Sequence, residues 1–455
     1  MLKVGVIGTG YVGLVSGTCL AELGHDVVCV DKDRDKVARL TAGEVPIYEP
    51  GLDELINANV GRNQLRFTAD LGEAVGEGVD FLFIAVGTPT DEAGSGGANL
   101  AYVHAAAEEA GRALAALKQA GAFTVVVIKS TVPVSTSRKV DAILSKHLPR
   151  ERYAVASNPE FLREGAAIDD FMEPDRIVIG SESERARQLL EELYLPLTRR
   201  GHRLVATSSA ETSELIKYAA NAFLATKVTF INELARLCEA AGADVEELSV
   251  GVGLDKRIGP KFLTPGPGFG GSCFPKDLVA LIKIANDFGS PVEIVETVIR
   301  ANDRHKLMMV RKIRSELGGS LTGRRIAILG LAFKANTDDM RNAPALTIGA
   351  QLIAEGAEVR AYDPVAAARA KALLPDLMIA ETIEAAARDA DAVVILTEWE
   401  AFRAIDWGAL APTMRRPLLI DLRNICEPKD VIRQGMQYVA LGRPVADSSY
   451  QAAAE

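Results

Sequence analysis

The sequence has few of the residues that build metal centres or disulfide frameworks. Its 455 residues include five cysteines and five histidines, and both kinds are scattered along the chain. The cysteines, at positions 19, 29, 238, 273 and 426, form no C-x-x-C pair and are odd in number. This pattern suits a reducing compartment and predicts no disulfide framework. Because no His/Cys cluster is visible, we expect no metal site, so catalysis would need an organic cofactor or side chains alone.

Long apolar runs and basic runs are missing too. No apolar run approaches the roughly 18 to 20 residues that are needed to span a bilayer. The opening residues, MLKVGVIGTG, enter a strand pattern at once, with no room for a signal peptide. The net charge of -10 argues against non-specific binding to nucleic acid. We therefore expect a cytoplasmic protein that contacts neither membranes nor nucleic acid.

What the sequence does contain is typical of an ordinary globular protein, with 48% hydrophobic and 25% charged residues. Its length predicts two to four domains. The first part alternates helical patterns with six apolar segments, namely KVGVIG, DVVCVD, DFLFIAVG, FTVVVIKS, YAVASNPE and RIVIG. Such near-continuous apolar runs indicate a parallel sheet that is buried on both faces. Loops at the carboxyl ends of its strands would line a ligand crevice.

The pattern changes at about residue 208, where one long helical stretch begins with Ser208 and Glu211 in capping-box spacing. Helical segments continue to about residue 318, and strand–helix alternation then returns with RRIAILG, EVRAYD, DAVVILT and PLLIDL. We predict an α/β protein with two doubly wound Rossmann-like domains, at residues 1–207 and 319–445, joined by a helical central domain at 208–318. The Ala/Ser-rich tail at 446–455 is expected to be frayed.

A dinucleotide site is indicated near the N-terminus. Gly8, Gly10 and Gly13 have G-x-G-x-x-G spacing directly after a strand and before a helix, and Asp31 ends the next strand. The glycines would let a pyrophosphate approach the helix N-terminus, and the carboxylate would accept from the ribose hydroxyls. An acid at position 31 favours NAD over NADP, whereas a tight turn without a ligand is the alternative interpretation. The last domain keeps only Gly330 of this pattern, and its loop carries Lys334 and Arg341, which suits nucleotide phosphates.

A second motif, GPGFGGSCFPKDL at residues 266–278, surrounds Cys273 with glycines and charges. Pro275 predicts a helix that begins beside Cys273, so the helix dipole and Lys276 would both favour the thiolate. The glycines would allow something bulky to approach closely. A flexible loop with an incidental cysteine is the alternative.

The long helix places Lys217 and Asn221 four residues apart, in line with an apolar stripe. Lys217 either snorkels from the helix end or is held in a site. An NAD site together with a nucleophilic thiol indicates oxidation of an aldehyde through a thiohemiacetal and a thioester. Asp277 or Glu160 could act as the base for hydrolysis, and Lys217 with Asn221 could stabilise the oxyanion.

Several segments together resemble the UDP-glucose/GDP-mannose dehydrogenase family. They are GTGYVGLVSG, IYEPGL, VGTPT, KSTVP, NPEFLREG, IKYAANAFLATKVTFINE, GFGGSCFPKD and GLAFK, and the resemblance runs from residue 1 to about 445. It implies two successive NAD-dependent oxidations at C6 of UDP-glucose, giving UDP-glucuronate for polysaccharide synthesis. It also implies that Cys273 is the nucleophile, that Lys217 and Asn221 stabilise the oxyanion, and that Asp277, Glu160 and Thr131 handle water and protons.

The resemblance implies binding residues as well. Those for NAD are Gly8, Gly10, Val12, Gly13, Asp31, Lys36, Thr88, Thr131, Glu164, Lys276 and Arg341. Those for the sugar nucleotide are Glu160, Phe161, Leu162, Arg163, Lys217, Asn221, Arg257, Phe262, Leu263, Thr264, Pro265, Gly266, Gly270 and Lys334. Arg257 matches an arginine that reaches a neighbouring subunit's substrate, which implies a homodimer or larger homo-oligomer built on the long helix.

Other activities remain open. Within the family the alternatives are GDP-mannose and UDP-N-acetylmannosamine, although relatives that act on the latter typically have histidine where Ser272 stands here. Outside it, a single-oxidation dehydrogenase of the 6-phosphogluconate or 3-hydroxy-acid type has a similar domain plan, and an NAD-sensing module is a further interpretation. The yield of NADH per sugar separates these classes: two for the family's reaction, one for a single-oxidation dehydrogenase and none for a sensor.

Overall fold

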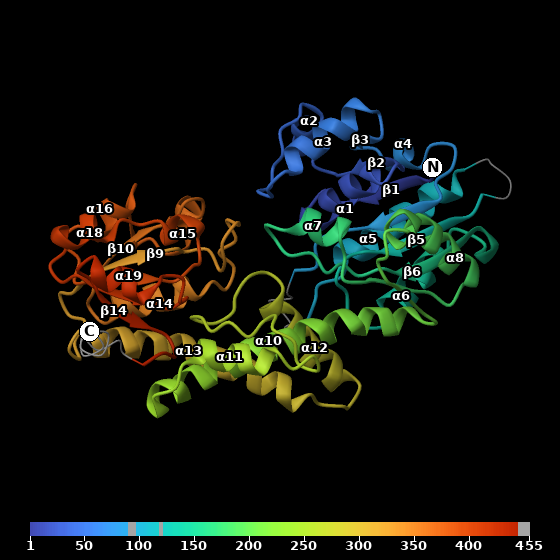
Figure 1. Ribbon diagram of the computed structural model, residues 1–455. Coiled ribbons are helices and arrows are strands. Elements are labelled where there is room, and N and C mark those ends of the chain that lie inside the picture. Colours follow the sequence, from blue (N-terminus) through green and yellow to red (C-terminus); the bar gives the residue numbers. More distant parts are fainter. Residues whose placement is uncertain (90–96, 118–121, 445–455) are drawn as a thin grey trace. The chain divides into compact units, whose positions relative to one another are not determined.

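The computed structural model describes residues 1–89, 97–117 and 122–444 (Figure 1). The chain divides into two compact units: the first comprises Met1–Ala220 and Val279–Pro291, and the second comprises Asn221–Leu278 and the chain from Val292 onward. The expected tail at 446–455 lies outside the described residues, and the three domain boundaries remain a prediction. Within the described ranges, no helix combines the length and the apolar character that a membrane crossing requires.

An eight-stranded sheet forms the centre of the first unit, in the order β3-β2-β1-β4-β5-β6-β7-β8. Its strands are β1 Lys3–Ile7, β2 Asp26–Val30, β3 Leu65–Thr68, β4 Phe81–Ile84, β5 Thr124–Ile128, β6 Tyr153–Ser157, β7 Ile177–Gly180 and β8 Leu204–Thr207. All pairs are parallel except β6 with β7, which pair antiparallel at Ser157 and Gly180. The prediction of a parallel sheet is therefore wrong for β7, the last of the six predicted strands. An apolar run such as that of β7 indicates that a strand is buried on both faces, but it does not indicate whether the strand is parallel or antiparallel to its neighbour.

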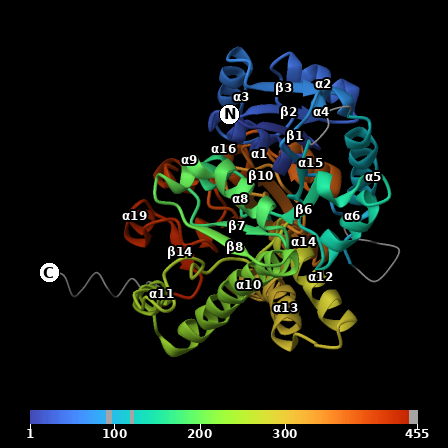
Figure 2. The ribbon, with the colours of Figure 1, turned by 90° about the vertical axis from the view of Figure 1, so that its right-hand side faces the viewer.

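Helices cover both faces of this sheet. They are α1 Tyr11–Glu22, α2 Arg34–Thr41, α3 Leu52–Gly61, α4 Leu71–Val75, α5 Ala101–Ala115, α6 Thr136–Leu144, α7 Ala167–Met172, α8 Glu184–Leu193 and α9 Leu195–Thr198, with the 3-10 turn η1 Arg150–Arg152. Successive residues of β4 alternate between two hydrophobic clusters: Phe81 and Phe83 face one, and Leu82 and Ile84 face the other. Figure 2 shows α5 and α6, which pack together on the second of these faces.

The second unit contains a six-stranded parallel sheet in the order β11-β10-β9-β12-β13-β14. Its strands are β9 Arg325–Leu329, β10 Glu358–Tyr362, β11 Met378–Ile379, β12 Ala392–Ile395, β13 Leu418–Asp421 and β14 Gln437–Ala440. The helices around it are α14 Pro344–Ala354, α15 Ala367–Leu373, α16 Ile383–Ala387, α17 Glu400–Arg403, α18 Trp407–Leu410 and α19 Pro428–Arg433, with η2 Ala411–Thr413. The order repeats that of the first six strands of the other sheet, so the prediction of two doubly wound domains is confirmed.

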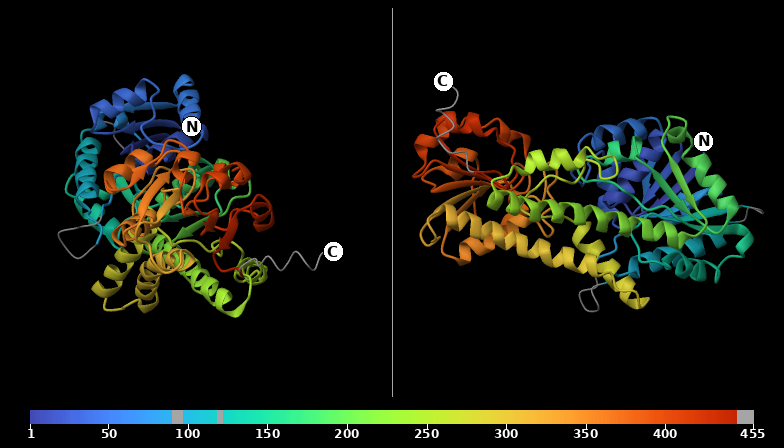
Figure 3. Two further views of the ribbon diagram at one scale, coloured as in Figure 1. Left: turned by 90° about the vertical axis from the view of Figure 1, so that its left-hand side faces the viewer. Right: turned by 60° about the horizontal axis from the view of Figure 1, so that its bottom comes forward.

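Four helices lie between the two sheets in sequence: α10 Ala210–Ala241, α11 Val245–Gly253, α12 Phe274–Asp287 and α13 Glu293–Glu316. In the second unit α13 runs beside the C-terminal part of α10 (Figure 3), and Lys312 pairs with Glu239 at 2.8 Å. The cap of α10 is not Ser208 as predicted. The helix begins at Ala210, so Ser209 is the capping residue, and its Oγ accepts from the Thr212 N–H at 3.3 Å.

Candidate active site

The three fingerprint glycines, in the turn between β1 and α1, differ in how closely other protein atoms surround them. Gly8 has φ +102°, and a Cβ there would lie 2.6 Å from the Ala85 carbonyl oxygen. A Cβ on Gly13 would lie 2.0 Å from the Gly8 oxygen, so this glycine allows α1 to pack on β1. Gly10 has an ordinary φ of -68°, and a Cβ there would meet no protein atom within 4 Å. The fold requires glycine at positions 8 and 13, whereas position 10 is left open for close approach of a ligand.

Asp31, at the end of β2, faces the same turn. Its carboxylate accepts from the Thr9 N–H at 3.0 Å, from Thr9 Oγ1 at 2.6 Å and from Lys36 Nζ at 2.9 Å. Burial by itself would raise the pKa of Asp31, but these donors outweigh it and lower the pKa to about 2. Asp31 is therefore an anion at neutral pH beside the open glycine, which fits the ribose of a dinucleotide.

Asp363 occupies the corresponding position at the end of β10 but cannot serve the same purpose. It is 3% exposed and accepts from five donors, which are the backbone N–H groups of Leu331, Ala332, Val365 and Ala366 and the indole N–H of Trp399. Because protein donors surround this carboxylate, it holds its own loop instead of a ribose. The two domains share a plan and differ in the role of one aspartate.

The remaining residues predicted to contact NAD are spread over several loops. Thr88 and Thr131 are in contact, since Thr88 Oγ1 donates to the Thr131 oxygen at 2.9 Å. Val12 lies in the first turn of α1, and Glu164 lies in the segment after β6. In the second unit, Lys276 pairs with Asp277 at 2.8 Å, and the mostly exposed Arg341 pairs with Asp339 at 2.8 Å.

A buried ion pair joins two predicted catalytic residues of the first unit. Lys217 Nζ lies 3.0 Å from Glu160 Oε1, and both side chains are at most 6% exposed. Glu160 Oε2 also accepts from the Leu162 N–H at 2.6 Å. Burial would raise the pKa of Glu160, but the charge and hydrogen bond of Lys217 outweigh it, so the pKa lies below its ordinary value. Lys217 is thus buried in an ion pair and does not snorkel to solvent.

Sequence reasoning missed a second lysine next to this pair. Lys129, in the KSTVP motif, is buried and donates to Asn158 Oδ1 at 3.1 Å. Burial and the charge of Lys217 lower the pKa of Lys129 to about 8, against the opposing attraction of Glu160. Tyr194 also donates to Asn158 Oδ1, at 2.6 Å. The sequence does contain a signal for Lys129, because a lysine directly after a fully buried strand needs a polar partner.

Glu49, in the IYEPGL motif, was also missed. It is buried, accepts from the Tyr11 hydroxyl, and accepts from the N–H groups of Gly165 at 2.6 Å and Ala167 at 2.7 Å. Glu49 therefore fixes the end of the NPEFLREG segment against the first turn of α1. In the same segment Arg163 pairs with Asp170 at 2.6 Å. The centroid of the Phe161 ring lies 5.4 Å from Lys217 Nζ and 4.0 Å from the Arg176 guanidinium carbon.

Cys273 immediately precedes α12, in the second unit, as the proline predicts. Its carbonyl oxygen accepts from the Asp277 N–H at 2.9 Å, which closes the first helical turn. The thiol is partly exposed, and the other four cysteines are buried. Asp277 is 1% exposed and accepts from Asn221 Nδ2 at 2.6 Å. The structure thus brings Asn221, Asp277 and Lys276 together at the start of the helix that follows Cys273.

The predicted substrate loop, from Phe262 to Gly266, and the residues that follow it up to Gly270 are held by buried polar side chains that sequence reasoning did not find. Asn232 accepts from the Gly266 N–H at 2.8 Å, and His305 Nε2 lies 2.8 Å from the Gly266 oxygen. Asn302 accepts from the Phe269 N–H at 2.8 Å and donates to its oxygen at 3.1 Å. Within the loop, Leu263 and Pro265 are buried, whereas Thr264 is exposed and Phe262 has φ +66°.

The glycines before Cys273 serve the protein's own packing. A Cβ on Gly270 would lie 2.3 Å from the Asn342 oxygen, and one on Gly271 would lie 2.8 Å from the Phe333 ring. What approaches them closely is therefore the GLAFKANTDDMRNAP segment of the same unit. Lys334, in that segment, lies over the Phe333 ring at 5.7 Å. The Arg257 side chain is 88% exposed and pairs with Asp255, two positions earlier in the sequence.

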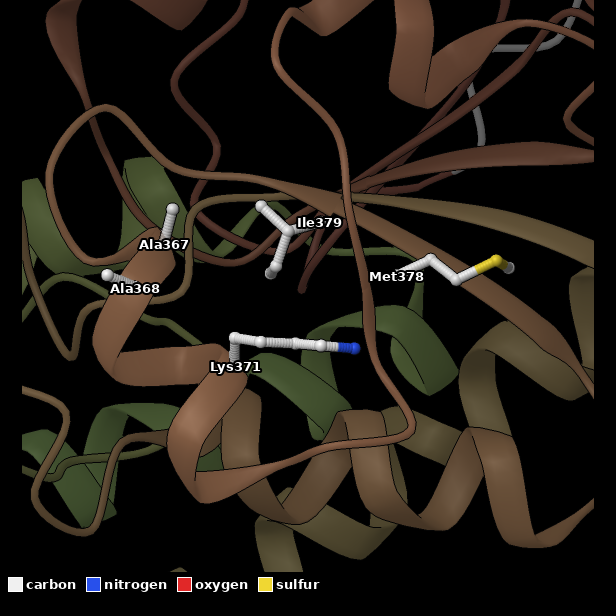
Figure 4. Close-up of a pocket in the computed structure, with 5 residues that line it drawn as sticks. All are labelled: Ala367, Ala368, Lys371, Met378 and Ile379. Atoms are coloured by element: carbon white, nitrogen blue, oxygen red, sulfur yellow. The ribbon is translucent and has the colours of Figure 1, made fainter.

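A shallow hollow beside β11 lies apart from these residues. Figure 4 shows the five side chains that line it, Ala367, Ala368, Lys371, Met378 and Ile379. The only charge among them, Lys371, already donates to the carbonyl oxygens of Pro375 and Leu377. None of the predicted site residues lines this hollow, so we assign it no part in the chemistry.

The chain matches the UDP-glucose/GDP-mannose dehydrogenase family over three segments. Residues 2–198 match its NAD binding domain, residues 211–304 its central domain and residues 327–428 its UDP binding domain. The UDP-glucose 6-dehydrogenase of Rhizobium meliloti is 53% identical over 97% of this chain and 100% of that protein. The UDP-glucose 6-dehydrogenase of Pseudomonas aeruginosa is 45% identical over 98% of each chain. A UDP-glucose dehydrogenase structure from Pyrobaculum islandicum superposes with a TM-score of 0.87 at 38% identity, over 97% of this chain and 98% of that one. The chain belongs to the UDP-glucose/GDP-mannose dehydrogenase family.

Proposed function

We propose that this protein is a UDP-glucose 6-dehydrogenase that oxidises the sugar C6 hydroxyl to a carboxylate in two NAD-dependent steps. Two relatives that match over nearly their whole length, at 53% and 45% identity, carry this activity in their names. The observation that carries the mechanism is the position of Cys273, partly exposed at the start of α12 and next to the buried pair of Asn221 and Asp277. A thiol at a helix N-terminus is favoured as thiolate, and a thiolate is the nucleophile that aldehyde oxidation needs.

The cofactor fits the first unit. When bound, NAD accepts the two electrons of each oxidation. Gly10 and the N-terminus of α1 would face its pyrophosphate, and Asp31 its ribose hydroxyls. Lys36 balances the charge of Asp31, and the contact between Thr88 and Thr131 fixes two loops at the same edge of the sheet. The glycine turn, Asp31 with Lys36 and the two threonine loops contain the proposed NAD residues of this unit other than Glu164.

The first oxidation removes two electrons and two protons from the C6 alcohol and leaves an aldehyde. Cys273 Sγ then adds to the aldehyde carbon and forms a thiohemiacetal. Oxidation of its C–H bond gives a thioester, and water cleaves the C–S bond to release the carboxylate and restore the thiol. Two sugar electrons leave in each oxidation, so each UDP-glucose yields two NADH.

The side chains divide these steps between them. Lys217 and Asn221, on successive turns of α10, are proposed to stabilise the oxygen that becomes negative in each tetrahedral species. Asp277, Glu160 and Thr131 are proposed to orient water and move protons. Glu160 stays ionised because Lys217 lowers its pKa, so it is available as a proton acceptor at neutral pH. The loop from Phe262 to Gly266, together with Phe161, Leu162, Arg163, Gly270 and Lys334, is proposed to hold the sugar nucleotide.

We also propose that the protein forms at least a homodimer through α10. This helix exposes three large apolar side chains at seven-residue spacing, Phe223, Phe230 and Leu237, each at least 50% exposed. An interface there would cover this stripe and would make Arg257 available to the partner subunit's substrate. The five free cysteines suit a cytoplasmic location, which is part of the proposal.

Replacement of Cys273 tests the proposed chemistry. Cys273→Ala should make no UDP-glucuronate at an appreciable rate. Cys273→Ser should abolish steady turnover with UDP-glucose and should trap a covalent sugar ester visible by intact mass, since an ester hydrolyses more slowly than a thioester. Cys238→Ala, which removes a buried thiol elsewhere, is the matched control and should keep its turnover. Parallel assays with UDP-glucose, GDP-mannose and UDP-N-acetylmannosamine should give two NADH per sugar with UDP-glucose. Near-normal UDP-glucuronate production by the alanine variant would end the thioester proposal.

A further inference from the structure

Glu214, in the second turn of α10, is a buried carboxylate to which no role has been assigned above. It is 2% exposed, and its oxygens accept three hydrogen bonds. The donors are the Ser135 N–H at 2.7 Å, the Ser137 N–H at 2.9 Å and Ser137 Oγ at 2.7 Å. All of these residues belong to the first unit. A carboxylate is buried only with such compensation, so these contacts are specific.

The donors lie at the start of α6, whose own capping residue does not cap it. Ser135 has φ +73°, and its side chain makes no capping hydrogen bond. The first N–H groups of a helix need acceptors from elsewhere, and an anion is favoured there by the helix dipole. Glu214 supplies both the acceptor oxygens and the negative charge, although it lies 77 to 79 positions from the donors in sequence.

The segment that Glu214 holds is the one that carries Thr131. Residues 129 to 135 connect β5 to α6, and the Thr131 oxygen is fixed at the other side by Thr88 Oγ1. On α10, Lys217 follows Glu214 by three residues and so lies on the same face of the helix. Ser213 Oγ donates to the Ser157 oxygen at 3.3 Å, and Ser157 lies three residues before Glu160. The first turns of α10 therefore contact both the segment that follows β5 and the last residue of β6.

We propose that Glu214 is a positioning residue for the oxidation: its carboxylate ties the Thr131 segment to the helix that carries Lys217. The inference rests on the function proposed above, because it assigns Thr131 and Lys217 to that reaction. A loosened segment would misplace Thr131 without removing any group that touches the substrate. The effect should therefore fall on kcat more than on KM for UDP-glucose.

The charge of Glu214 gives the proposal a pH signature. Burial and, to a smaller extent, the nearby Glu211 carboxylate outweigh the hydrogen bonds from Ser137 and Ser135 and raise the pKa of Glu214 to about 7. Arg138 pairs with Glu211 and Glu182 and leaves Glu214 without an ion pair among the described contacts. A protonated carboxyl group has fewer acceptor sites than a carboxylate. The hydrogen bonds from Ser135 and Ser137 to Glu214 should therefore weaken as the pH falls through 7, and kcat should fall as they weaken.

The test compares Glu214→Gln with Glu211→Gln, the same change one turn earlier on α10 at a residue that is not buried. For each, kcat and both KM values are measured from pH 6 to 9, with thermal unfolding as the check on folding. We expect Glu214→Gln to lower kcat about tenfold at pH 8, to change KM for UDP-glucose much less, and to lose the fall of kcat near pH 7. Glu211→Gln should keep the wild-type kcat at pH 8 and should still show the fall of kcat, moved to lower pH because a charge that raises the pKa of Glu214 is removed.

Ser137→Ala gives a second measurement should Glu214→Gln fold poorly. It removes one donor to the carboxylate, so the fall of kcat should move to higher pH. A kcat profile unchanged in both variants, or a loss confined to KM, would overturn the proposed role of Glu214. A wild-type protein that produces no UDP-glucuronate would instead overturn the proposed function, so the two failures are distinguishable.

Discussion

Substitution of Gly10 and of Gly13 by alanine should have opposite consequences, although both belong to one fingerprint. The Gly13 methyl group would lie 2.0 Å from the Gly8 oxygen, more than 1 Å inside normal contact, so α1 must move away from β1. Overpacking of this kind costs about 1 to 3 kcal/mol, and a backbone clash belongs at the upper end. In a unit of this size, about 3 kcal/mol corresponds to a fall of roughly 6 to 12 °C in the unfolding temperature.

The Gly10 methyl group would meet no protein atom within 4 Å and needs no change in φ. Alanine is a poorer capping residue than glycine by less than about 1 kcal/mol. The lower entropy of the unfolded chain returns about 0.4 to 1 kcal/mol, so the net change in stability is close to zero. In the complex, however, the methyl group would occupy the space of the pyrophosphate. The loss of one charge-assisted hydrogen bond, about 1.5 to 3 kcal/mol, raises the Kd for NAD at least about tenfold.

Thermal unfolding without ligand and calorimetric titration with NAD separate the two variants. Gly10→Ala should unfold with the wild type and bind NAD weakly, whereas Gly13→Ala should unfold early even without NAD. If Gly10→Ala bound NAD as tightly as the wild type, position 10 would not face the cofactor, and the assignment of the site to this turn would be refuted. Wild-type stability of Gly13→Ala would refute the packing argument alone.

Three further predictions concern other charged and polar groups. Asp31→Arg should weaken NAD binding and shift preference toward NADP, because the ribose hydroxyls lose an acceptor and a 2′-phosphate gains a partner; an unchanged KM for NAD would contradict this. Lys217→Ala should lower kcat far more than it weakens UDP-glucose binding, since an oxyanion partner acts mainly in the transition state, and equal losses in both would assign Lys217 to ground-state binding. Burial lowers the pKa of His305 to about 4, so its contribution to stability is complete above its ordinary pKa of about 6.5 and is lost as the pH falls toward 4. Between pH 6.5 and 5 the wild type should lose about 2 kcal/mol more than His305→Gln in urea unfolding, and parallel losses would show that His305 does not titrate there.

Much of this protein was readable from the sequence because the relevant physics is local. Runs such as TVVVI in β5 are apolar on both faces, and only a strand between two layers of helices buries both. The glycine fingerprint and the GSCFPKD motif are also local, since a turn, a helix start and a neighbouring charge involve residues within a few positions of one another. The edge strand β3, LRFT, was missed because Arg66 interrupts its apolar pattern, and β8, LVAT, was missed although its sequence is mostly apolar.

Only the tertiary structure decided which distant groups meet. Lys217 could have been a snorkelling lysine until Glu160, 57 positions earlier, was found at 3.0 Å. Glu214 resembles any helical glutamate in sequence, and its role depends on Ser135 and Ser137 at the end of another loop. The direction of β7 and the clamp of Asn232 and His305 on Gly266 are further cases. A buried polar group needs a hydrogen-bonding or charged partner. When that partner is far along the chain, tertiary packing determines which residue it is, and no periodic pattern in the sequence indicates it.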